Sequence, residues 1–235
     1  MPEIRRMSDS EEEVSSGHVS RNSLNASPNR ELETFKHPLQ NKWTLWYFKN
    51  DRAKDWESNQ KQVNRPSVKS RMYAFRKSIL QVITFSTVED FWALYNHIEN
   101  ASKLGNGCDY SLFKEGIKPM WEDAHNEHGG KWLLQMDKRS RMNVLDVVWL
   151  EIMMCLIGEA FGDSGNIVNG AVVNIRPKAD KISVWLADSV KSNQIMAIGQ
   201  EMKGRLRLAD RELVFESHKD SMNRSSSSVK AKFMI

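Results

Sequence analysis

Apolar residues recur at three- and four-residue spacing in three stretches of the chain, which predicts three amphipathic helices. The first opens at Ser86-Thr87-Val88-Glu89, a sequence typical of a capping box, and runs to Ile98. The second is predicted to begin at Asn143 and to end at Gly158. The third spans about residues 189–204.

Short runs rich in β-branched and aromatic residues separate these helices and predict strands. The predicted strands are residues 43–48, 131–136, 171–176, 181–187 and, as the last strand, 211–217. A Gly129-Gly130 turn precedes the second run, and a turn with a proline joins the third and fourth as in a hairpin. This pattern predicts an α+β domain, with helices on one face of a curved antiparallel sheet and a concave site on the other face.

The second predicted helix is apolar on nearly every side, which packing on one sheet does not require. Leu150, Met154 and Gly158 fall at positions i, i+4 and i+8 and form a second stripe. This stripe has two interpretations. It is either a groove for a partner, with Trp92 of the first helix as its neighbour, or a surface buried between layers. Periodicity alone favours burial.

Length and cysteine usage bound the class of protein. A chain of 235 residues can bury a sizeable core without disulfide or metal staples, and Cys108 and Cys155 lack the spacing of a redox or metal motif. Reduced thiols are typical of the cytosol and nucleus, so we expect a cytoplasmic protein, with the nucleus or RNA granules as further locations. We expect neither a secretory leader nor a membrane span, because no run approaches roughly 20 apolar residues.

The ends of the chain differ in composition from its centre. Residues 1–36 are rich in Ser, Asn, Glu and Arg and poor in apolar residues, which predicts a disordered tail. A Ser-rich stretch at about residues 219–230 predicts a mobile loop. We therefore predict one domain at residues 37–235 that includes this loop.

The dipeptide Trp121-Glu122 has the chemistry to read a guanine. The indole offers a flat face for stacking, and the carboxylate only accepts hydrogen bonds, while the Watson–Crick edge of guanine presents two adjacent donors. A cationic cluster downstream, at Arg176, Lys178 and Lys181, could hold phosphates. The dipeptide alone is weak support, because a half-buried Trp with a solvated Glu is a common arrangement.

Catalytic motifs are absent from the sequence. The run His125-Asn126-Glu127-His128 resembles a metal cluster, but its polar surroundings predict solvent exposure, and histidines at i and i+3 converge only on a helix. No Ser-His-Asp or Cys-His pairing stands in a motif context, and there is no P-loop or GxGxxG. We therefore expect a binding protein rather than an enzyme, with no metal and no cofactor.

Six strings in the same order resemble the translation initiation factor 4E family. They are residues 37–41 (HPLQN), 87–98 (TVEDFWALYNHI), 108–113 (CDYSLF), 119–123 (PMWED), 149–151 (WLE) and 170–174 (GAVVN). The resemblance covers about residues 35–235 apart from one insert. It implies a curved eight-stranded antiparallel sheet with three helices on its convex face, and the 7-methylguanosine cap of mRNA bound on its concave face.

The resemblance also implies a role for each matching residue of the cap site. Trp56 and Trp121 would sandwich the methylated base, Glu122 would accept from its edge, and Trp185 would contact the N7 methyl group. The triphosphate would be held by Arg176, Lys178 and Lys181, with Lys131 nearby where the family usually has Arg. Secondary contacts would come from Asp109, Asn174 and Arg224.

A partner surface is implied as well. It would dock helices of the Tyr-x-x-x-x-Leu-hydrophobic type, from the initiation scaffold 4G and from repressors that mimic it, which favours the groove over burial. Its residues would be His37, Pro38, Val88, Trp92, Leu150, Glu151, Met154 and Gly158. The implied function is recruitment of 4G to capped mRNA to start cap-dependent translation. A possible phosphorylation site falls at Ser227.

One basic segment departs from the family. Residues 64–81 carry five cations and no acid, so without them the formal net charge of +4 becomes −1. The segment is a tolerated surface loop, or a basic arm that contacts RNA with Tyr73 and Phe75 able to stack on bases, or a translated intron or gene-model error that damages the strand after Trp56. The alternative function is therefore a protein-interaction paralogue or translational repressor with weakened cap binding.

Overall fold

The computed structural model describes residues 35–49, 79–207, 211–222 and 231–235. Contacts divide the chain into residues 1–35 and 36–235, and the fold described below is that of the second unit. Most of the predicted N-terminal tail and of the predicted Ser-rich loop lies outside the described residues.

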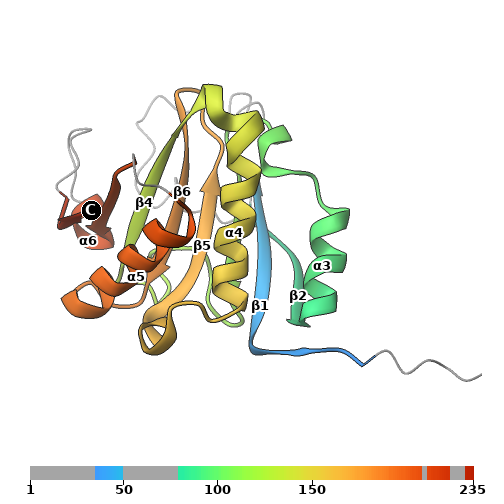
Figure 1. Cartoon of the computed structure of the whole chain (residues 1–235), viewed down its shortest axis with the longest axis horizontal. Coiled ribbons are helices and arrows are strands. Elements are labelled where there is room, and N and C mark those ends of the chain that lie inside the picture. Colours follow the sequence, from blue (N-terminus) through green and yellow to red (C-terminus); the bar gives the residue numbers. More distant parts are fainter. Residues whose placement is uncertain (1–34, 50–78, 208–210, 223–230) are drawn as a thin grey trace, which may run out of the picture. The chain divides into compact units, whose positions relative to one another are not determined.

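Eight strands form one antiparallel sheet in the order β2-β1-β3-β5-β6-β4-β7-β8 (Figure 1). The strands are β1 (Pro38–Lys49), β2 (Ile79–Thr87), β3 (Cys108–Lys114), β4 (Gly130–Asp137), β5 (Val168–Asn174), β6 (Ala179–Leu186), β7 (Leu213–Ser217) and β8 (Phe233–Met234). The predicted eight-stranded sheet and the β5–β6 hairpin are confirmed. The prediction that the strand near residues 211–217 is the last was wrong, because β8 follows and pairs with β7.

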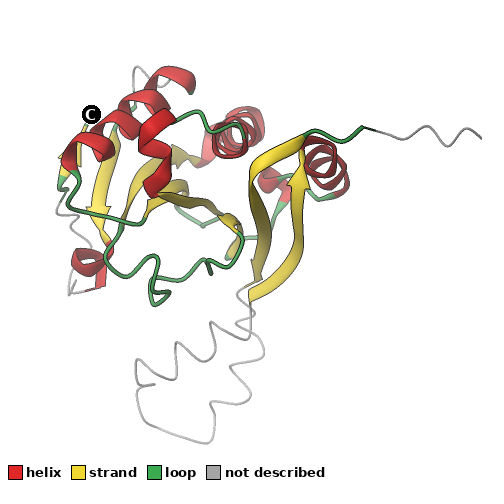
Figure 2. Cartoon of the chain, turned by 90° about the horizontal axis from the view of Figure 1, so that it is seen from below, coloured by secondary structure: helices red, strands yellow, loops and turns green. Residues whose placement is uncertain are grey.

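Three long helices cover one face of the sheet, as Figure 2 shows from below. They are α3 (Val88–His97), α4 (Asp146–Ile157) and α5 (Ser192–Arg205), and a short α6 (His218–Met222) follows β7. Shorter turns complete the helical elements of the described residues: the 3-10 turns η1 (Ala101–Lys103), η2 (Lys138–Ser140) and η4 (Gly162–Ile167), and the π-helical turn η3 (Arg141–Leu145).

The core lies between these helices and the sheet. Alternate residues of β4, namely Trp132, Leu134 and Met136, point to the helices and are fully buried. The Trp132 indole donates to the carbonyl of Ile195 in α5 at 2.9 Å. A Cβ on Gly199 of α5 would lie 2.5 Å from the Trp132 ring, so only glycine allows this close approach.

The start of α3 differs by one residue from the predicted capping box. The N-cap is Thr87, not Ser86, and its hydroxyl accepts from the backbone N–H of Asp90 at 3.2 Å. Glu89 does not reach back to the cap, because its carboxylate accepts instead from the backbone N–H of His37 at 2.9 Å. The helix therefore begins one residue later and is fixed to the start of β1.

The prediction that Asn143 starts the second helix was also wrong. Asn143 is exposed within η3, and the helical path begins earlier, at η2. There the Asp137 carboxylate accepts from the Arg139 backbone N–H at 2.8 Å. The predicted end at Gly158 is confirmed, since its N–H caps the last turn of α4.

The predicted basic insert overlaps the described residues only at its end. Its residues 79–81 form the start of β2, which pairs with β1 through to Thr87. The strand after the insert, β2, is therefore formed. Residues 64–78 lie outside the described residues.

Candidate functional site

The sheet face away from α3, α4 and α5, here called the open face, gathers most of the predicted site. Directly opposed residues of antiparallel strands point to the same face. One row across the sheet contains Trp185, Lys131 and Glu216, and a second contains Asp109, Asn174 and Lys181. The rows are four residues apart along β6, about 13 Å. They define a Trp185 end and a Lys181 end of the open face.

Trp185 is held from several sides. Its half-buried ring packs edge-on against Phe113, with centroids 5.6 Å apart, and its indole N–H donates to the Ser183 hydroxyl at 3.2 Å. A Cβ on Gly170 would lie 2.5 Å from the Phe113 ring, so glycine is needed for Phe113 to lie across β5 and support Trp185. The His218 ring lies 4.3 Å from Trp185, centroid to centroid.

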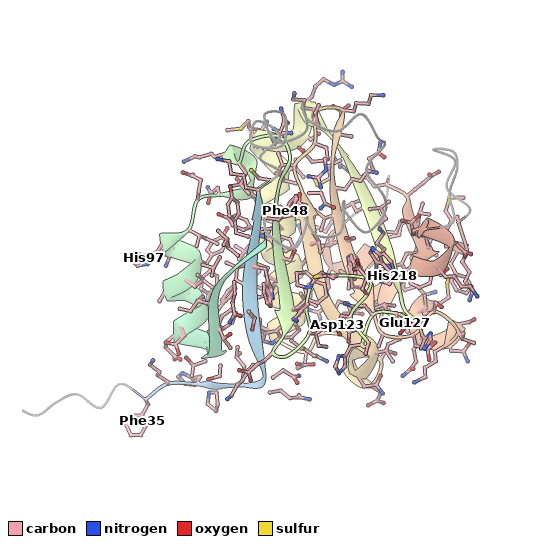
Figure 3. All side chains as sticks on the ribbon, turned by 180° about the vertical axis from the view of Figure 1, so that it is seen from behind. Phe35, Phe48, His97, Asp123, Glu127 and His218 are labelled. Atoms are coloured by element: carbon pink, nitrogen blue, oxygen red, sulfur yellow. The ribbon has the colours of Figure 1, made fainter. Side chains whose placement is uncertain are left out.

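His218 is part of this end and has no counterpart among the sequence-based candidates. Figure 3 shows it from behind the sheet, on the side that also carries Phe48. Burial lowers the pKa of His218 to about 4, with a smaller contribution from the Lys131 charge, so the ring is neutral at pH 7. Its Nε2 is buried and has no hydrogen-bond partner among the described residues.

Lys131 lies at the Trp185 end rather than beside Lys181. Its Nζ is 3.2 Å from the carboxylate of Glu216 and 5.8 Å from the centroid of the Trp185 ring. Glu216 is only 3 % exposed, and sequence reasoning missed it because its partner is 85 residues away. The ion pair compensates the charge of Lys131 beside Trp185.

The loop between β3 and β4 carries Trp121 and Glu122, and a fully buried Asn126 fixes its shape. The Asn126 amide donates to the carbonyls of Lys118 and Met120, both at 2.9 Å. Its oxygen accepts from Asn169 of β5 at 2.9 Å. The predicted solvent exposure of residues 125–128 is therefore wrong for Asn126, while its three neighbours are exposed.

The loop ends next to Trp185. The backbone N–H of His218 donates to the carbonyl of Gly129 at 3.0 Å, and Gly130 opens β4 one residue before Lys131. Asp123 accepts from the Lys118 N–H at 3.0 Å and closes the segment that contains Trp121 and Glu122. The dipeptide is thus displayed on a rigid loop.

Glu122 is not simply a solvated side chain. The residue is half-buried, and its Oε2 is buried without a hydrogen-bond partner among the described residues. An unpaired buried carboxylate oxygen is costly, and a ligand with suitably placed N–H donors would satisfy it. Trp121 beside it is half-buried.

The Lys181 end holds the predicted cations. Arg176 makes a bidentate ion pair with Asp109, with Nη2–Oδ2 at 2.9 Å, and its side chain stays 36 % exposed. Burial raises the pKa of Asp109, and the Arg176 charge opposes this rise. Because Asp109 is occupied by Arg176, it orients that guanidinium rather than facing a ligand. Lys181 is half-buried and Lys178 is exposed in the β5–β6 turn.

The predicted partner residues lie on the helix side, and we call them the dorsal face. On α4, Leu150, Glu151 and Met154 are half-buried and Gly158 is exposed, so the stripe is not buried between layers. Sequence reasoning missed Val147, which extends the stripe and is 67 % exposed.

The rest of the dorsal face comes from β1 and α3. Trp92 is 38 % exposed and packs on Phe91 and Tyr95, with ring centroids 5.1 and 5.9 Å away. Val88 is half-buried and donates its N–H to the carbonyl of exposed His37 at 2.9 Å, and Pro38 next to it is exposed. The dorsal face therefore exposes apolar side chains, and ring packing and backbone hydrogen bonds hold its parts in place.

Three predicted residues, Trp56, Arg224 and Ser227, lie outside the described residues. Within the residues that are described, no helix has the length and apolarity of a membrane span. No group of three or more His, Cys, Asp or Glu side chains there could hold a metal ion.

Comparison with known proteins gives matches along most of the chain. A family model described as "Eukaryotic initiation factor 4E" matches residues 38–233. Eukaryotic translation initiation factor 4E-1A of Danio rerio is 46 % identical over 201 residues, which are 85 % of each chain.

Solved structures agree. Ascaris suum eIF4E-3 in complex with an m2,2,7G cap has a TM-score of 0.72 and 46 % identity, covering 86 % of this chain and 99 % of that one. The same protein with an m7G cap has a TM-score of 0.71 and 44 % identity, covering 86 % of this chain and 98 % of that one. C. elegans eIF4E-3 with the 4E-binding protein Mextli has a TM-score of 0.72 and 42 % identity, covering 86 % of this chain and 100 % of that one.

Proposed function

The chain belongs to the eukaryotic initiation factor 4E family, and on that premise we propose that its open face binds the 7-methylguanosine cap of mRNA. The observation that carries the proposal is the buried, unpaired Oε2 of Glu122 beside half-buried Trp121. Guanine offers N1–H and N2–H to such an acceptor. Methylation at N7 makes the base cationic, so these hydrogen bonds become charge-assisted.

The remaining residues of the site follow from this placement of the base. Trp121 stacks on one side and Trp56 on the other, each contributing roughly 1–2 kcal/mol of cation–π attraction to the methylated base. Trp185, supported by neutral His218, receives the N7 methyl group. The triphosphate then extends toward Arg176, Lys181 and Lys178 at the other end of the open face.

The proposed activity is binding without a chemical step. The cap is held and released unchanged, and the chain acts by joining the mRNA to a second protein. A nucleotide site with one unpaired acceptor, stacking rings and cations suits recognition of a ligand.

Retention on immobilised 7-methyl-GTP tests the cap proposal. The full-length chain should be retained, and free 7-methyl-GTP should release it while GTP at the same concentration should not. If the full-length chain washes through but a variant lacking residues 64–78 is retained, the alternative of a paralogue with weakened cap binding is correct. If neither is retained, the cap proposal is wrong.

We propose that the dorsal face docks the amphipathic helix of a 4E-binding partner, including the initiation scaffold 4G and 4E-binding repressors. Exposed Trp92 and Val147 and half-buried Leu150 form an apolar surface of the kind that receives the i, i+3/i+4, i+7 anchors of a partner helix. Glu151 lies within the same α4 stripe and can pair with a basic residue of the partner.

Replacing Trp92 with Ala separates the two faces. Binding of a Tyr-x-x-x-x-Leu-hydrophobic peptide should weaken by at least roughly 2 kcal/mol, as for an interface hot spot, while 7-methyl-GTP binding is unchanged. The matched control is Val190→Ala, which removes an apolar side chain that is 75 % exposed outside the dorsal face. Equal peptide affinity in Trp92→Ala and the wild type would contradict the docking proposal.

A further inference from the structure

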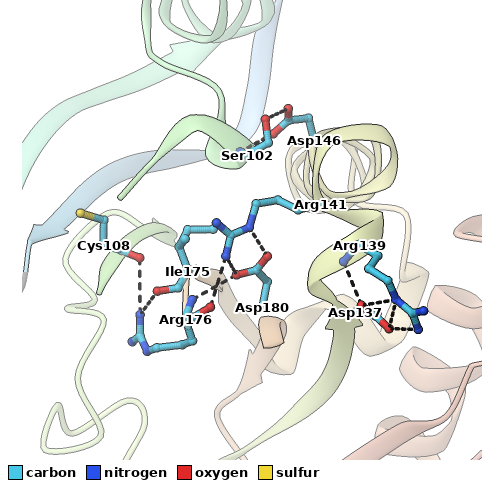
Figure 4. A network of polar contacts seen from close by, with 9 residues as sticks. All are labelled: Ser102, Cys108, Asp137, Arg139, Arg141, Asp146, Ile175, Arg176 and Asp180. Atoms are coloured by element: carbon cyan, nitrogen blue, oxygen red, sulfur yellow. Dashed lines mark hydrogen bonds and ion pairs between the residues drawn. The ribbon is translucent and has the colours of Figure 1, made fainter. Parts of the chain in front are cut away.

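Besides the Arg176–Asp109 pair, two further arginine–aspartate pairs lie at the Lys181 end, and they differ in burial (Figure 4). Arg141 pairs with Asp180 through Nε–Oδ2 at 2.5 Å and Nη2–Oδ1 at 2.6 Å, and the Asp180 side chain is fully buried. Arg139 pairs with Asp137 at 2.8 Å, but its side chain is 92 % exposed. A buried ion pair is a weak source of stability, because desolvation offsets the attraction. Stability alone therefore does not explain why the Arg141–Asp180 pair is buried.

The other hydrogen bonds of the buried pair go to one residue. Asp180 accepts from the backbone N–H of Arg176 at 3.0 Å, and Arg141 donates to the backbone carbonyl of Arg176 at 3.2 Å. Both polar backbone groups of Arg176 are therefore held by the pair. Arg139 and Asp137 make no such contact with Arg176 among the hydrogen bonds of the described residues.

The side chain of Arg176 is fixed from the opposite direction. Its Nη2 donates to Asp109 at 2.9 Å, and its Nη1 donates to the carbonyl of Ile175 at 3.0 Å. The guanidinium has five donors, and about a third of the side chain remains exposed. Because both its backbone and its tip are hydrogen-bonded, the Arg176 guanidinium has little freedom to turn before an anion binds.

We propose that Arg141 and Asp180 are positioning residues for the cap triphosphate. They hold the backbone of Arg176 so that its free donors face the phosphates before the ligand arrives, which removes part of the ordering cost of binding. The inference rests on the proposed cap-binding function. It predicts that the buried pair affects the contribution of the phosphates to affinity and not that of the base.

The comparison of 7-methyl-GTP with 7-methylguanosine isolates this contribution, because the two ligands share the base and sugar. Arg141→Lys keeps the positive charge but loses the fork that bonds Asp180 and Arg176 together. Arg139→Lys makes the same chemical change in the exposed pair and is the matched control. A merely structural role for Arg141 would lower stability without changing the ratio of the two affinities.

Calorimetric titration of the full chain with each ligand gives that ratio. Arg141→Lys should weaken 7-methyl-GTP binding about tenfold, the loss expected for one hydrogen bond to a charged group, and leave 7-methylguanosine binding unchanged. Arg139→Lys should leave both affinities unchanged. An unchanged ratio in Arg141→Lys, or an equal fall in Arg139→Lys, overturns the inference.

A second variant covers the case in which Arg141→Lys does not fold. Asp180→Asn keeps an acceptor for the Arg176 N–H but loses the bidentate ion pair, so it should lower the same ratio, and a folded Asp180→Asn with the wild-type ratio overturns the inference. If the wild type binds neither ligand, the cap proposal fails and this inference fails with it. If the wild type binds both and only the expected change of ratio is missing, the cap proposal stands and the positioning role is wrong.

Discussion

On the open face of the sheet, two carboxylates are buried and paired with cations, whereas on the dorsal face apolar side chains are exposed. Asp109 and Glu216 are 6 % and 3 % exposed and each has a cationic partner. Trp92 and Val147, on the other side, are 38 % and 67 % exposed. Both faces therefore depart from the usual distribution, in which charged side chains are exposed and large apolar side chains are buried.

The difference indicates two kinds of ligand. Fixed, desolvated polar groups recognise a small charged ligand with little reorganisation, because their orientation is already set by other side chains. Exposed apolar side chains gain free energy only when a partner covers them, so the dorsal face suits a helix with a complementary apolar stripe. One sheet thus carries a preorganised polar site and an apolar docking surface on opposite sides.

The largest expected effect concerns the two histidines that belong to these faces. His218 on the open face is buried and its pKa is lowered from 6.5 to about 4, whereas the side chain of His37 on the dorsal face is 78 % exposed and pairs with Glu89 at 2.6 Å. As pH falls below 6.5, the unfolded chain takes up a proton at His218 before the folded chain does. The contribution of neutral His218 to the free energy of unfolding should therefore be fully present above pH 6.5. It should fall by roughly 3 kcal/mol on approach to pH 4.

Urea unfolding of the wild type and of His218→Gln at pH 7 and pH 4.5 measures this effect. The loss of unfolding free energy between the two pH values should be smaller in His218→Gln by most of that amount. His37→Gln is the control and should keep the wild-type loss. The same pH dependence in the wild type and His218→Gln would mean that His218 is not held neutral by burial.

A smaller effect is expected from Glu216, which neutralises Lys131 beside Trp185. Replacing Glu216 with Gln keeps the shape but frees a positive charge 5.8 Å from the ring that receives the methyl group. A cationic base should then lose more affinity than a neutral one. The ratio of 7-methyl-GTP to GTP affinity should fall about threefold, the size of a partly screened charge interaction.

Fluorescence titration with the two nucleotides measures the ratio. Glu212→Gln is the matched control, because Glu212 is exposed just before β7 and is not in the row of Trp185 and Lys131. An unchanged ratio in Glu216→Gln would show that the ion pair is only structural. An equal fall in Glu212→Gln would attribute the change to net charge.

The sequence predicted the features that depend on local periodicity. Five of the strands and the three long helices follow from residue type and from alternating or three- and four-residue spacing, and Trp121-Glu122 is readable as a local pair. The strands β2 and β3 were implied only by the family resemblance. The two-residue β8 is too short to give a pattern, and its place depends on pairing with β7. The N-cap of α3 differs from the prediction because Ser86 and Thr87 both offer a hydroxyl. In addition, the Glu89 carboxylate accepts from the backbone N–H of His37, 52 residues away, and not from the cap.

The parts of the site that sequence reasoning missed are long-range polar contacts. Asn126 meets Asn169 43 residues on, and Arg141 meets Asp180 39 residues on. Buried polar groups must find partners, but nothing in their sequence neighbourhood says which ones. His218 follows a strand in a polar segment and gains its role only when the fold brings it against Trp185.

Cap recognition by the open face is tested most directly by the affinity of Glu122→Gln for 7-methyl-GTP, compared with Glu127→Gln in the same loop. Glu127 is exposed, so its replacement removes the same charge without touching the buried acceptor. Glu122→Gln should bind 7-methyl-GTP about a hundredfold more weakly than the wild type, as expected for lost charge-assisted hydrogen bonds to a buried carboxylate oxygen, while Glu127→Gln should bind as the wild type does. Equal affinity in a folded Glu122→Gln and the wild type would contradict cap recognition by the open face.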